Sequence, residues 1–444
     1  MNIIKIGGAV LKSQSGFEAM IDILKKYTER PLLIVISAFS KATRDLAKAA
    51  KLAEAGNEKE AMAILEKVID EHLNYARILL KNKDTLESLI LLFESSKQRL
   101  SEFIKGLSIT GELTARTLDA VLSFGEFFAL HTVNHYLQEQ GFELYCVDST
   151  SLIVSDDNYG NAKPLLKETA KQVKEKLIPK LEENSIVLTQ GFVAKNRMGE
   201  ITTMGIESSN LTASLYAEIL CAKSITFWTD VPGLRTADPK IVEQTFPIPA
   251  LNYSDAYKAA TNGLKLIHPK MLEYVSSQNI SLIYKSAFEP DNAKTVISAE
   301  NNEPNKPMII SREDLMFSEI PLTSDKSKEE ADSLINKLLR ESSDIIKHSV
   351  FPESIRIIYK KSSSLEKKLS RNFSMISTLH CSLVTVLNTG HIRHKFVNNK
   401  ILDKYSEKII NFDCSADSIR MIVLPEITNE IVKELHEFIF EKIK

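Results

Sequence analysis

A lysine that directly precedes two glycines is the first feature of this sequence that could carry chemistry. Lys5-Ile6-Gly7-Gly8 ends a short apolar segment at the start of the chain. Paired glycines let backbone N–H groups approach an anion closely, and a lysine beside them can place a positive charge on a transferring phosphate. Because a lysine before a tight turn is also typical of a solvated loop, this segment alone leaves both interpretations open.

Three capping-type residues, Ser208, Ser209 and Asn210, form a second candidate anion site. They precede an apolar segment with helical spacing. The first N–H groups of a helix have no partners within the helix, so they bind anions readily. A well-capped helix without a ligand fits the same residues.

Two further polar segments could contact a nucleotide. An expected strand ends at Thr229, and a polar loop follows from Asp230 to Lys240. Open α/β sheets bind ligands at the carboxyl ends of their strands, which is where this loop is expected to lie. Lys265, in the segment 263–269, could also reach a phosphate. The sequence has no P-loop, GxGxxG, HExxH, EF-hand or GxSxG motif.

The elements that position these residues alternate between strands and helices. A strand over 2–6, a helix over 17–27 and an apolar strand over 32–37 form a βαβ unit, which predicts a parallel sheet covered by helices. Residues 43–108 have the spacing of long helices and predict a helical hairpin inserted into this sheet. The pattern then predicts strands over 143–148, 186–189, 224–229 and 281–284, and helices over 118–140, 165–181, 210–222 and 253–262.

The last part of the chain differs in composition. Residues 301–307 hold three asparagines and two prolines, which is typical of a linker. The Lys/Ser-rich region beyond it has βαββαβ-like alternation and suits a pair of regulatory modules. Its expected elements are a helix over 328–342, strands over 355–359, 383–387 and 419–424, and a helix over 430–443.

Composition limits the class of protein. A chain of 444 residues predicts two or three domains, and 43% apolar with 26% charged residues is typical of globular proteins. A net charge of −2 gives no field that would attract nucleic acid or an acidic membrane. Four cysteines without zinc spacing favour a reducing, cytoplasmic compartment. No apolar run reaches the roughly 20 residues that cross a bilayer.

Taken in order, the motifs resemble those of aspartokinases, in the amino-acid kinase superfamily. The likeness covers residues 1 to about 295. More weakly, 415–440 resembles the end of that family's ligand-sensing ACT domains. The segments that carry the main resemblance are Lys5–Gly8, Ser37-Ala38 with Thr43, Ser123-Phe124-Gly125-Glu126, 228–233 and 263–269.

The resemblance implies a three-layer, parallel-sheet amino-acid kinase fold with a helical insertion, followed by α+β, ferredoxin-like ACT-type modules. The implied domains are a catalytic domain over 1–300, with the insertion over 44–110, and two degenerate ACT-like modules over 308–444. Residues 323–330 form a Ser/Lys/Glu run where the family carries its effector loop. Dimer packing and feedback regulation are both open as roles for these modules.

The implied reaction transfers the γ-phosphoryl group of ATP, with Mg²⁺, to the β-carboxylate of L-aspartate, the first step of lysine, threonine and methionine synthesis. Implied partners are L-aspartate or a related amino acid and a second copy of the chain, without nucleic acid or membrane. No metal site of the protein's own is expected. The implied roles are catalysis for Lys5, Gly7 and Gly8, substrate binding for Ser37, Thr43, Glu126 and Asn210, and nucleotide binding for Ser208, Ser209, Thr229, Asp230, Arg235, Lys240 and Lys265.

The sequence departs from the family at the substrate end. The family's Gly-Arg-Gly-Gly-Ser-Asp is 205–210 here, so Ile206 replaces the arginine expected on the substrate α-carboxylate and Asn210 replaces the aspartate expected on its ammonium group. The usual nucleotide-loop tyrosine is Arg235, and Arg197 is one residue that could compensate. Three functions therefore stay open: an aspartate kinase, a kinase of another small acid, and a non-catalytic nucleotide-binding regulator.

Overall fold

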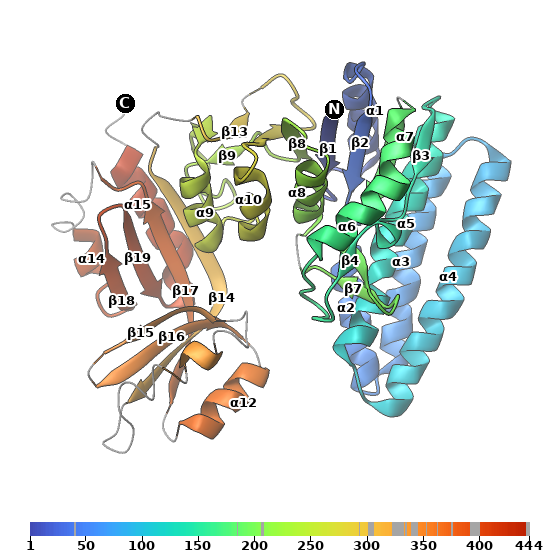
Figure 1. Cartoon of the computed structure of the whole chain (residues 1–444). Helices are drawn as coiled ribbons and strands as arrows, with labels where there is room; N and C mark the ends of the chain where they lie inside the picture. The colour runs from blue at the N-terminus through green and yellow to red at the C-terminus, as the bar shows by residue number, and fades with distance from the viewer. Residues whose placement is uncertain are drawn as a thin grey trace. The chain divides into compact units, whose positions relative to one another are not determined.

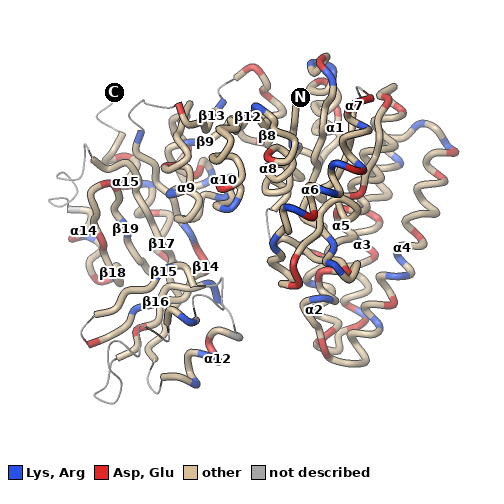
Figure 2. Tube along the Cα trace, viewed as in Figure 1, with Lys and Arg blue, Asp and Glu red and all other residues tan. Residues whose placement is uncertain are grey.

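The computed structural model divides the chain into two compact units. The first contains Met1–Leu234, Pro249–Tyr257 and Lys265–Glu303, and the second contains Arg235–Ile248, Lys258–Leu264 and Pro304–Lys444. Basic and acidic residues are interspersed along the tube in both units (Figure 2). The structure describes residues 1–39, 41–183, 185–205, 208–292, 294–300, 306–321, 333, 335–338, 345–351, 353–361, 363–373, 376–390 and 400–440.

An eight-stranded sheet forms the centre of the first unit (Figure 1). The strands from β12 through β8, β1, β2 and β5 to β3 pair in parallel, and only β13 is antiparallel to its neighbour β12. All five residues of β2 are buried, as a strand covered on both faces requires. In spatial order the strands are β11 (Ala250–Leu251), β13 (Thr295–Ile297), β12 (Ser281–Ser286), β8 (Ser224–Thr229), β1 (Asn2–Ile6), β2 (Leu32–Ile36), β5 (Ile186–Gln190) and β3 (Leu144–Cys146).

Helices connect these strands, and a small sheet lies beside them. The small sheet has the order β4 (Val154–Ser155), β6 (Val193–Asn196), β7 (Ile201–Thr203). The connecting helices are α1 (Gln14–Lys26), α5 (Ala115–Glu139), α6 (Leu166–Gln172), α7 (Ile178–Glu182), α8 (Ser209–Ile219), α9 (Tyr253–Thr261) and α10 (Pro269–Ser276). The helix expected over 165–181 is instead α6 and α7 joined by a π-helical turn at Val173–Leu177.

Three helices, rather than the expected hairpin of two, occupy the segment between β2 and α5. They are α2 (Ala42–Glu54), α3 (Glu58–Leu79) and α4 (Lys83–Thr110). Gly111, at φ +65°, ends α4 in the left-handed conformation that glycine adopts without strain. The apolar faces of all three helices join the same core as β1 and β2.

Helix α3 packs against the loops that follow β1 and β2. Phe39 stacks on the ring of His72, with ring centroids 4.9 Å apart, and makes edge contacts with Phe17 and Tyr75. The Tyr75 hydroxyl donates a hydrogen bond of 2.6 Å to the carbonyl oxygen of Lys12. Helix α3 of the insertion therefore contacts the loops after both strands.

The second unit contains a six-stranded antiparallel sheet. Its strands, in spatial order, are β15 (Ile345–Val350), β16 (Ser354–Lys360), β14 (Met308–Pro321), β17 (Ser377–Leu387), β19 (Ser418–Val423) and β18 (Ile409–Cys414). The described helices are α12 (Ser363–Asn372), α14 (Lys400–Lys404) and α15 (Thr428–Phe440). The order of β15, β16 and β14 is mirrored by β18, β19 and β17, so the sheet consists of two halves with corresponding strand order. The two-residue strands β9 (Leu234–Arg235) and β10 (Pro247–Ile248) precede them in sequence.

Several expectations for this region need correction. Strand β14, which has 14 residues and lies beside β17 in the middle of the sheet, was not expected at all. The strand expected over 383–387 is only the end of the longer β17. The expected helix over 328–342 is helical at 333 and 335–338, but its other residues, the run 323–330 and most of the linker lie outside the described residues.

The predicted fold class, a parallel α/β region followed by an α+β region, is confirmed by these two sheets. Within the described part of the chain, no helix combines the length and the apolar character needed to cross a membrane.

We predict that His72→Phe stabilises the first unit in mild acid. His72 is buried, its Nδ1 lies 2.6 Å from the Val68 carbonyl oxygen, and its Nε2 has no partner in the described part of the chain. Burial lowers the pKa of His72 from 6.5 to about 4, so between these values the unfolded chain binds a proton that the folded chain does not. Through His72, the free energy of unfolding of the wild type therefore falls by roughly 1.4 kcal/mol for each pH unit between 6.5 and 4.

Urea unfolding of both proteins at several pH values measures this effect. The stability difference between His72→Phe and the wild type should grow as pH falls from 6.5 toward 4. A difference that stays constant across this range would contradict the assignment of a buried, neutral His72.

Candidate functional site

The carboxyl ends of four neighbouring strands lie side by side along the carboxyl-terminal edge of the eight-stranded sheet, the edge at which its parallel strands end. The register aligns Ile6 with Ile36 and with Trp228, and Ile36 with Gln190. The residues that follow β1, β2, β5 and β8 therefore lie along the same edge. Strand β1 lies between β2 on one side and β8 on the other, so the order of the strands reverses at β1. Open α/β sheets bind ligands at such a topological switch point.

The glycine pair lets the loop after β1 approach its neighbours closely. The Gly7 N–H donates to the Trp228 carbonyl oxygen at 3.0 Å. A Cβ atom added at Gly8 would lie 2.1 Å from the Ala38 carbonyl oxygen, so no residue with a side chain fits at this position. A Cβ atom added at Gly7 would lie 3.7 Å from the Nζ of Lys5, so the ammonium group is beside this turn. Lys5 and both glycines thus form one cradle at the switch point.

Glu126, on α5, places a buried carboxyl group at the end of β2. Its Oε1 accepts a hydrogen bond of 3.2 Å from the Ala38 N–H, and its Oε2 has no partner in the described part of the chain. Burial raises the pKa of Glu126 to about 8, although the Ala38 hydrogen bond and the nearby charge of Lys5 both act to lower it. A half-satisfied buried carboxyl group of this kind is suited to receive a cationic or hydrogen-bonding ligand.

Ser37 and Thr43 lie beside residues that adjoin Glu126 or its hydrogen-bond partner Ala38. The Cβ of Ser37 lies 3.6 Å from a Cβ added at Gly8. A Cβ added at Gly125 would lie 3.4 Å from the Ala38 Cβ and 3.6 Å from the Thr43 hydroxyl oxygen. The structure therefore brings the predicted residues Ser37, Thr43 and Glu126 together with the glycine cradle.

The amino end of α8 lies at the same edge of the sheet. A Cβ atom added at Gly191, directly after β5, would lie 2.6 Å from the Cα of Ser209, the first residue of α8. Ser208 is fully buried, and its hydroxyl has no partner in the described residues. The partial positive charge at this helix end and the unused hydroxyl together favour an anion.

Asn210 has a structural contact that the sequence does not reveal. Its Nδ2 donates a hydrogen bond of 3.0 Å to the Leu266 carbonyl oxygen, which also accepts one of 3.1 Å from the Tyr284 hydroxyl. The amide thus joins α8 to the segment 263–269, where Lys265 is exposed. A contact between Asn210 and a substrate ammonium group stays a prediction.

The predicted nucleotide residues fall into two groups. Thr229 ends β8 and Asp230 follows it. The Thr229 hydroxyl donates to the Val231 carbonyl oxygen, and exposed Asp230 pairs with Lys12 at 3.4 Å. Arg235 and Lys240 belong to the second unit. The Arg235 guanidinium group donates to the hydroxyl and the carbonyl oxygen of Thr245, and the backbone N–H of Lys240 donates to Asp238. Nucleotide contacts of Arg235 and Lys240 stay predictions.

Sequence reasoning missed Asp119, which organises the loops beside the site. This fully buried carboxylate accepts the N–H groups of Gly160 and Thr203, both at 2.8 Å, and the Thr203 hydroxyl at 2.6 Å. An acidic residue seven positions before Glu126, on the same face of a largely apolar helix, was the available signal. Arg197, considered as a compensating cation, is paired with Glu168 on the surface. Ile206 and Glu207 lie outside the described residues.

The described residues show how a nucleotide with its cation would fit. The buried Ser208 hydroxyl without a partner, the cradle that excludes a Cβ at Gly8 and the Lys5 ammonium group are all suited to phosphate oxygens. No group of three or more His, Cys, Asp or Glu side chains comes together among the described residues to hold a metal ion. Mg²⁺ usually binds through substrate phosphates and one or two carboxylates, so it would arrive with the nucleotide.

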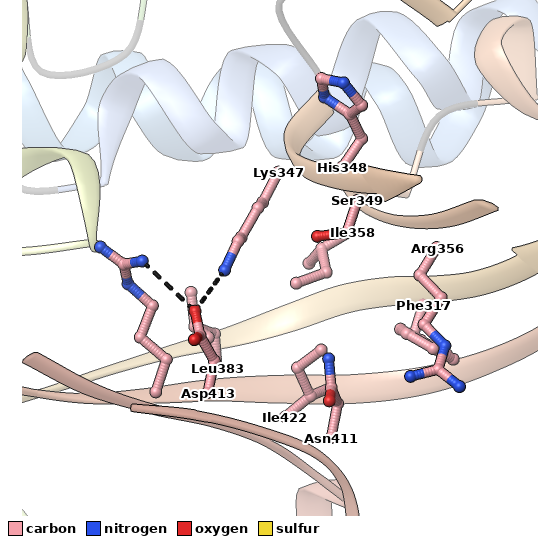
Figure 3. Close-up of a pocket in the computed structure, with 11 residues that line it drawn as sticks. Phe317, Lys347, His348, Ser349, Arg356, Ile358, Leu383, Asn411, Asp413 and Ile422 are labelled. Carbon is pink, nitrogen blue, oxygen red and sulfur yellow. Dashed lines mark hydrogen bonds and ion pairs between the residues drawn. The ribbon is translucent and has the colours of Figure 1, made fainter. Parts of the chain in front are cut away.

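A pocket on the sheet of the second unit has a different character (Figure 3). Asp413 accepts a hydrogen bond of 2.8 Å from Lys347 and lies 3.7 Å from Arg420. The pocket floor is apolar, with Phe317, Ile358, Leu383 and Ile422 among the lining residues. Asp413 pairs with both Lys347 and Arg420, so these three groups together carry a net charge of +1.

We predict that Asn210→Asp destabilises the first unit at neutral pH. The substitution replaces an N–H donor by a carboxylate oxygen facing the Leu266 carbonyl, and a lost, unsatisfied contact of this kind costs about 1–3 kcal/mol. Lowering the pH from 7 to 5 should reduce the difference from wild type, since a protonated aspartate can donate again. Equal urea midpoints for the two proteins at pH 7 would argue against this contact.

We also predict that Glu126→Gln stabilises the ligand-free protein in alkali. The folded state raises the pKa of Glu126 from 4.5 to about 8, so stability at this position is full below pH 4.5 and is lost as pH rises toward 8. Glutamine can accept the Ala38 hydrogen bond without this cost. The stability difference, measured by urea unfolding at pH 5 and pH 8, should be larger at pH 8, and a pH-independent difference would refute the raised pKa.

Comparison with known proteins places the fold in a family. Residues 1–285 match the family model described as the amino acid kinase family. Aspartokinase 1, chloroplastic, of Arabidopsis thaliana is 28% identical over 299 residues, which cover 67% of this chain and 52% of the relative. Lysine-sensitive aspartokinase 3 of Escherichia coli (strain K12) is 24% identical over 429 residues, which cover 92% of each chain. The matched region thus spans about half the length of the Arabidopsis relative but nearly all of the bacterial one.

A solved structure extends this likeness to the whole chain. The structure of E. coli aspartokinase III in complex with aspartate and ADP (R-state) matches with a TM-score of 0.86 and 21% identity, covering 99% of this chain and 100% of that one. The predicted resemblance to aspartokinases and the predicted fold are therefore confirmed. With a family match over its first 285 residues, this chain belongs to the amino acid kinase family.

Proposed function

We propose that this chain is an aspartate kinase, which transfers the γ-phosphoryl group of MgATP to the β-carboxylate of L-aspartate to form 4-phospho-L-aspartate. The observation that carries the proposal is the buried Glu126 carboxyl group, whose Oε2 has no partner among the described residues, near Lys5 and the glycine cradle. It combines a phosphate-binding turn with a carboxyl group that can receive an ammonium group. A kinase acting on an amino acid needs both.

Lys5 and the glycine turn serve the transferring group. In the proposed reaction a β-carboxylate oxygen forms a bond to the γ-phosphorus, while the bond from that phosphorus to the β,γ-bridging oxygen breaks and ADP leaves. The acceptor is already ionised at neutral pH, because the usual pKa of an aspartate side chain is about 3.9, so no general base is required. Catalysis then depends on positioning and on neutralising phosphate charge, which Lys5 and backbone N–H groups supply.

Glu126 is proposed to bind the ammonium group of the amino acid. A cation placed at Oε2 would favour the ionised carboxylate and lower the pKa of Glu126 from about 8. Binding an amino acid is thus coupled to loss of the Glu126 proton. Ser37 and Thr43, which lie next to Ala38 and Gly125, are proposed to hydrogen-bond the same ligand.

The nucleotide is proposed to lie along the ends of β1 and β8. Ser208 and Ser209 would contact phosphate oxygens from the start of α8, Thr229 and Asp230 would flank the nucleotide after β8, and Lys265 would add positive charge. We extend this proposal to Arg235 and Lys240 by the family resemblance. Mg²⁺, bound to the phosphates, supplies charge neutralisation when present.

The named relatives support this assignment. The matching E. coli structure is described as a complex with aspartate and ADP, and the curated relatives are named aspartokinases. On that basis we propose ATP as the donor, L-aspartate as the acceptor and amino-acid biosynthesis, including that of lysine, as the pathway. The homodimer and the cytoplasmic location inferred from the sequence stay predictions.

A second candidate function is the phosphorylation of another small acid. Asn210 favours this alternative, because its amide nitrogen is already bonded to Leu266 and the residue carries no charge for a substrate ammonium group. The same assay separates the two candidates. Release of ADP with aspartate, together with a hydroxamate trapped by hydroxylamine, supports the first, and turnover only with other acids supports the second.

We predict that Lys5→Ala abolishes phosphoryl transfer while the protein stays folded. Lys5 is proposed to act on charge that develops in the transition state, and loss of one such donor lowers kcat by about 10²- to 10³-fold. A coupled ADP-release assay, with circular dichroism as the folding control, measures this. Lys223→Ala, which removes an exposed lysine just before β8, should leave turnover unchanged. Undiminished turnover of Lys5→Ala would remove Lys5 from the mechanism.

A further inference from the structure

Lys270 is a half-buried cation whose hydrogen-bond partner among the described residues is a neutral amide. It is the second residue of α10, and its Nζ lies 3.4 Å from the Oδ1 of Asn161. No carboxylate forms an ion pair with Lys270 among the described residues. A partly desolvated ammonium group that has only an amide oxygen as a partner is suited to bind an additional anion.

A second lysine adds to the positive charge at this point. Burial and the nearby charge of Lys163 both lower the pKa of Lys270, whereas Glu273 and Asp156 act in the opposite direction with smaller effect. The Oδ1 of Asp156 already accepts hydrogen bonds from the N–H groups of Asn158, at 3.2 Å, and Lys163, at 2.9 Å. Two lysines close enough to repel each other would both gain from an anion bound between them.

These groups border the segment that leads into α8. The Oδ1 of Asn161 would lie 3.3 Å from a Cβ added at Gly205, whose φ of +93° also requires glycine. Ser208, with its unused buried hydroxyl, follows three residues later. The two lysines and the Asn161 amide therefore lie at the same turn as the amino end of α8.

Helix α5 links this turn to Glu126. Asp119 binds the N–H groups of Gly160 and Thr203, which adjoin Asn161 and lie two residues before Gly205. Asp119 and Glu126 are seven residues apart on α5, which corresponds to about 10 Å along the helix. Asp119 and Glu126 therefore lie on one face of α5, and an acceptor with its ammonium group at Glu126 would direct a carboxylate toward this turn.

We propose that Lys270, assisted by Lys163 and the amide nitrogen of Asn161, binds the carboxylate of the acceptor that is not phosphorylated. In L-aspartate this is the α-carboxylate. This inference rests on the proposed function, because it takes the acceptor to be an acidic amino acid. It assigns substrate recognition to α10 in a chain whose sequence has Ile206 and Asn210 where the family has arginine and aspartate. A nucleotide phosphate is the other anion that could bind here, and the experiment distinguishes the two.

The test compares two ligands that differ by one carboxylate. β-Alanine is L-aspartate without its α-carboxylate. We would measure the binding of both to the full chain by isothermal titration calorimetry, for the wild type, Lys270→Ala and Lys270→Arg. Lys167→Ala, which removes an exposed lysine on α6, is the matched control.

We expect the wild type and Lys167→Ala to prefer L-aspartate over β-alanine by about tenfold to a hundredfold, the range for a hydrogen bond to a charged group. Lys270→Ala should lose this preference while its affinity for β-alanine and its Kd for ADP stay unchanged. Lys270→Arg should restore part of the preference. This pattern supports the subsite even if aspartate binds without being phosphorylated, in which case the proposed function fails and the subsite stands.

Three results would overturn the subsite. The first is an unchanged preference for L-aspartate in Lys270→Ala. The second is a rise in the KM for ATP or in the Kd of ADP without a change in aspartate binding, which would assign Lys270 to a phosphate. The third is a wild type that binds neither L-aspartate nor β-alanine.

Discussion

The close contact between the loops that follow β1 and β2 is the constraint on which the rest of the site depends. Gly8 has no room for a Cβ because the Ala38 carbonyl oxygen occupies that space, and the Ala38 N–H fixes one oxygen of Glu126. The next residue, Phe39, is stacked on His72 of α3. Three parts of the first unit, the central sheet, α5 and the inserted helices, therefore converge on two adjacent residues. This is why a buried carboxyl group can be held half-satisfied at the edge of the sheet.

Local patterns in the sequence were sufficient for the features that depend on neighbours along the chain. The all-apolar segment of β2 predicts a strand buried on both faces, and Lys5 followed by two glycines predicts a turn that backbone groups can approach. Ser37, Thr43 and Glu126 came from the family resemblance, and the structure brings them to that same turn. The parallel direction of the strands follows from the alternation of strands and helices, since each crossover helix returns the chain to the same end of the sheet.

Contacts between distant residues were beyond the sequence pattern. Asn210 is bonded to a carbonyl group 56 positions away, and Asp119 holds a residue 84 positions away. Strand β14 was missed because Arg312, Glu313 and Asp314 interrupt its apolar pattern. At that point the pairing with β17 shifts register and Asp314 takes a φ of +57°. Charged residues at a β-bulge look like a loop in the sequence, because the strand that pairs on either side of the bulge cannot be identified from the sequence alone.

The central claim is that Lys5 meets the terminal phosphate of a nucleotide at the end of β1. Its most direct test is labelling with an acyl phosphate of ATP, a reagent that transfers its acyl group to a lysine in contact with the terminal phosphate, followed by peptide mass spectrometry. The account predicts acylation of Lys5 that excess MgATP prevents. Labelling of other lysines with Lys5 unmodified, or labelling that MgATP does not reduce, would contradict it.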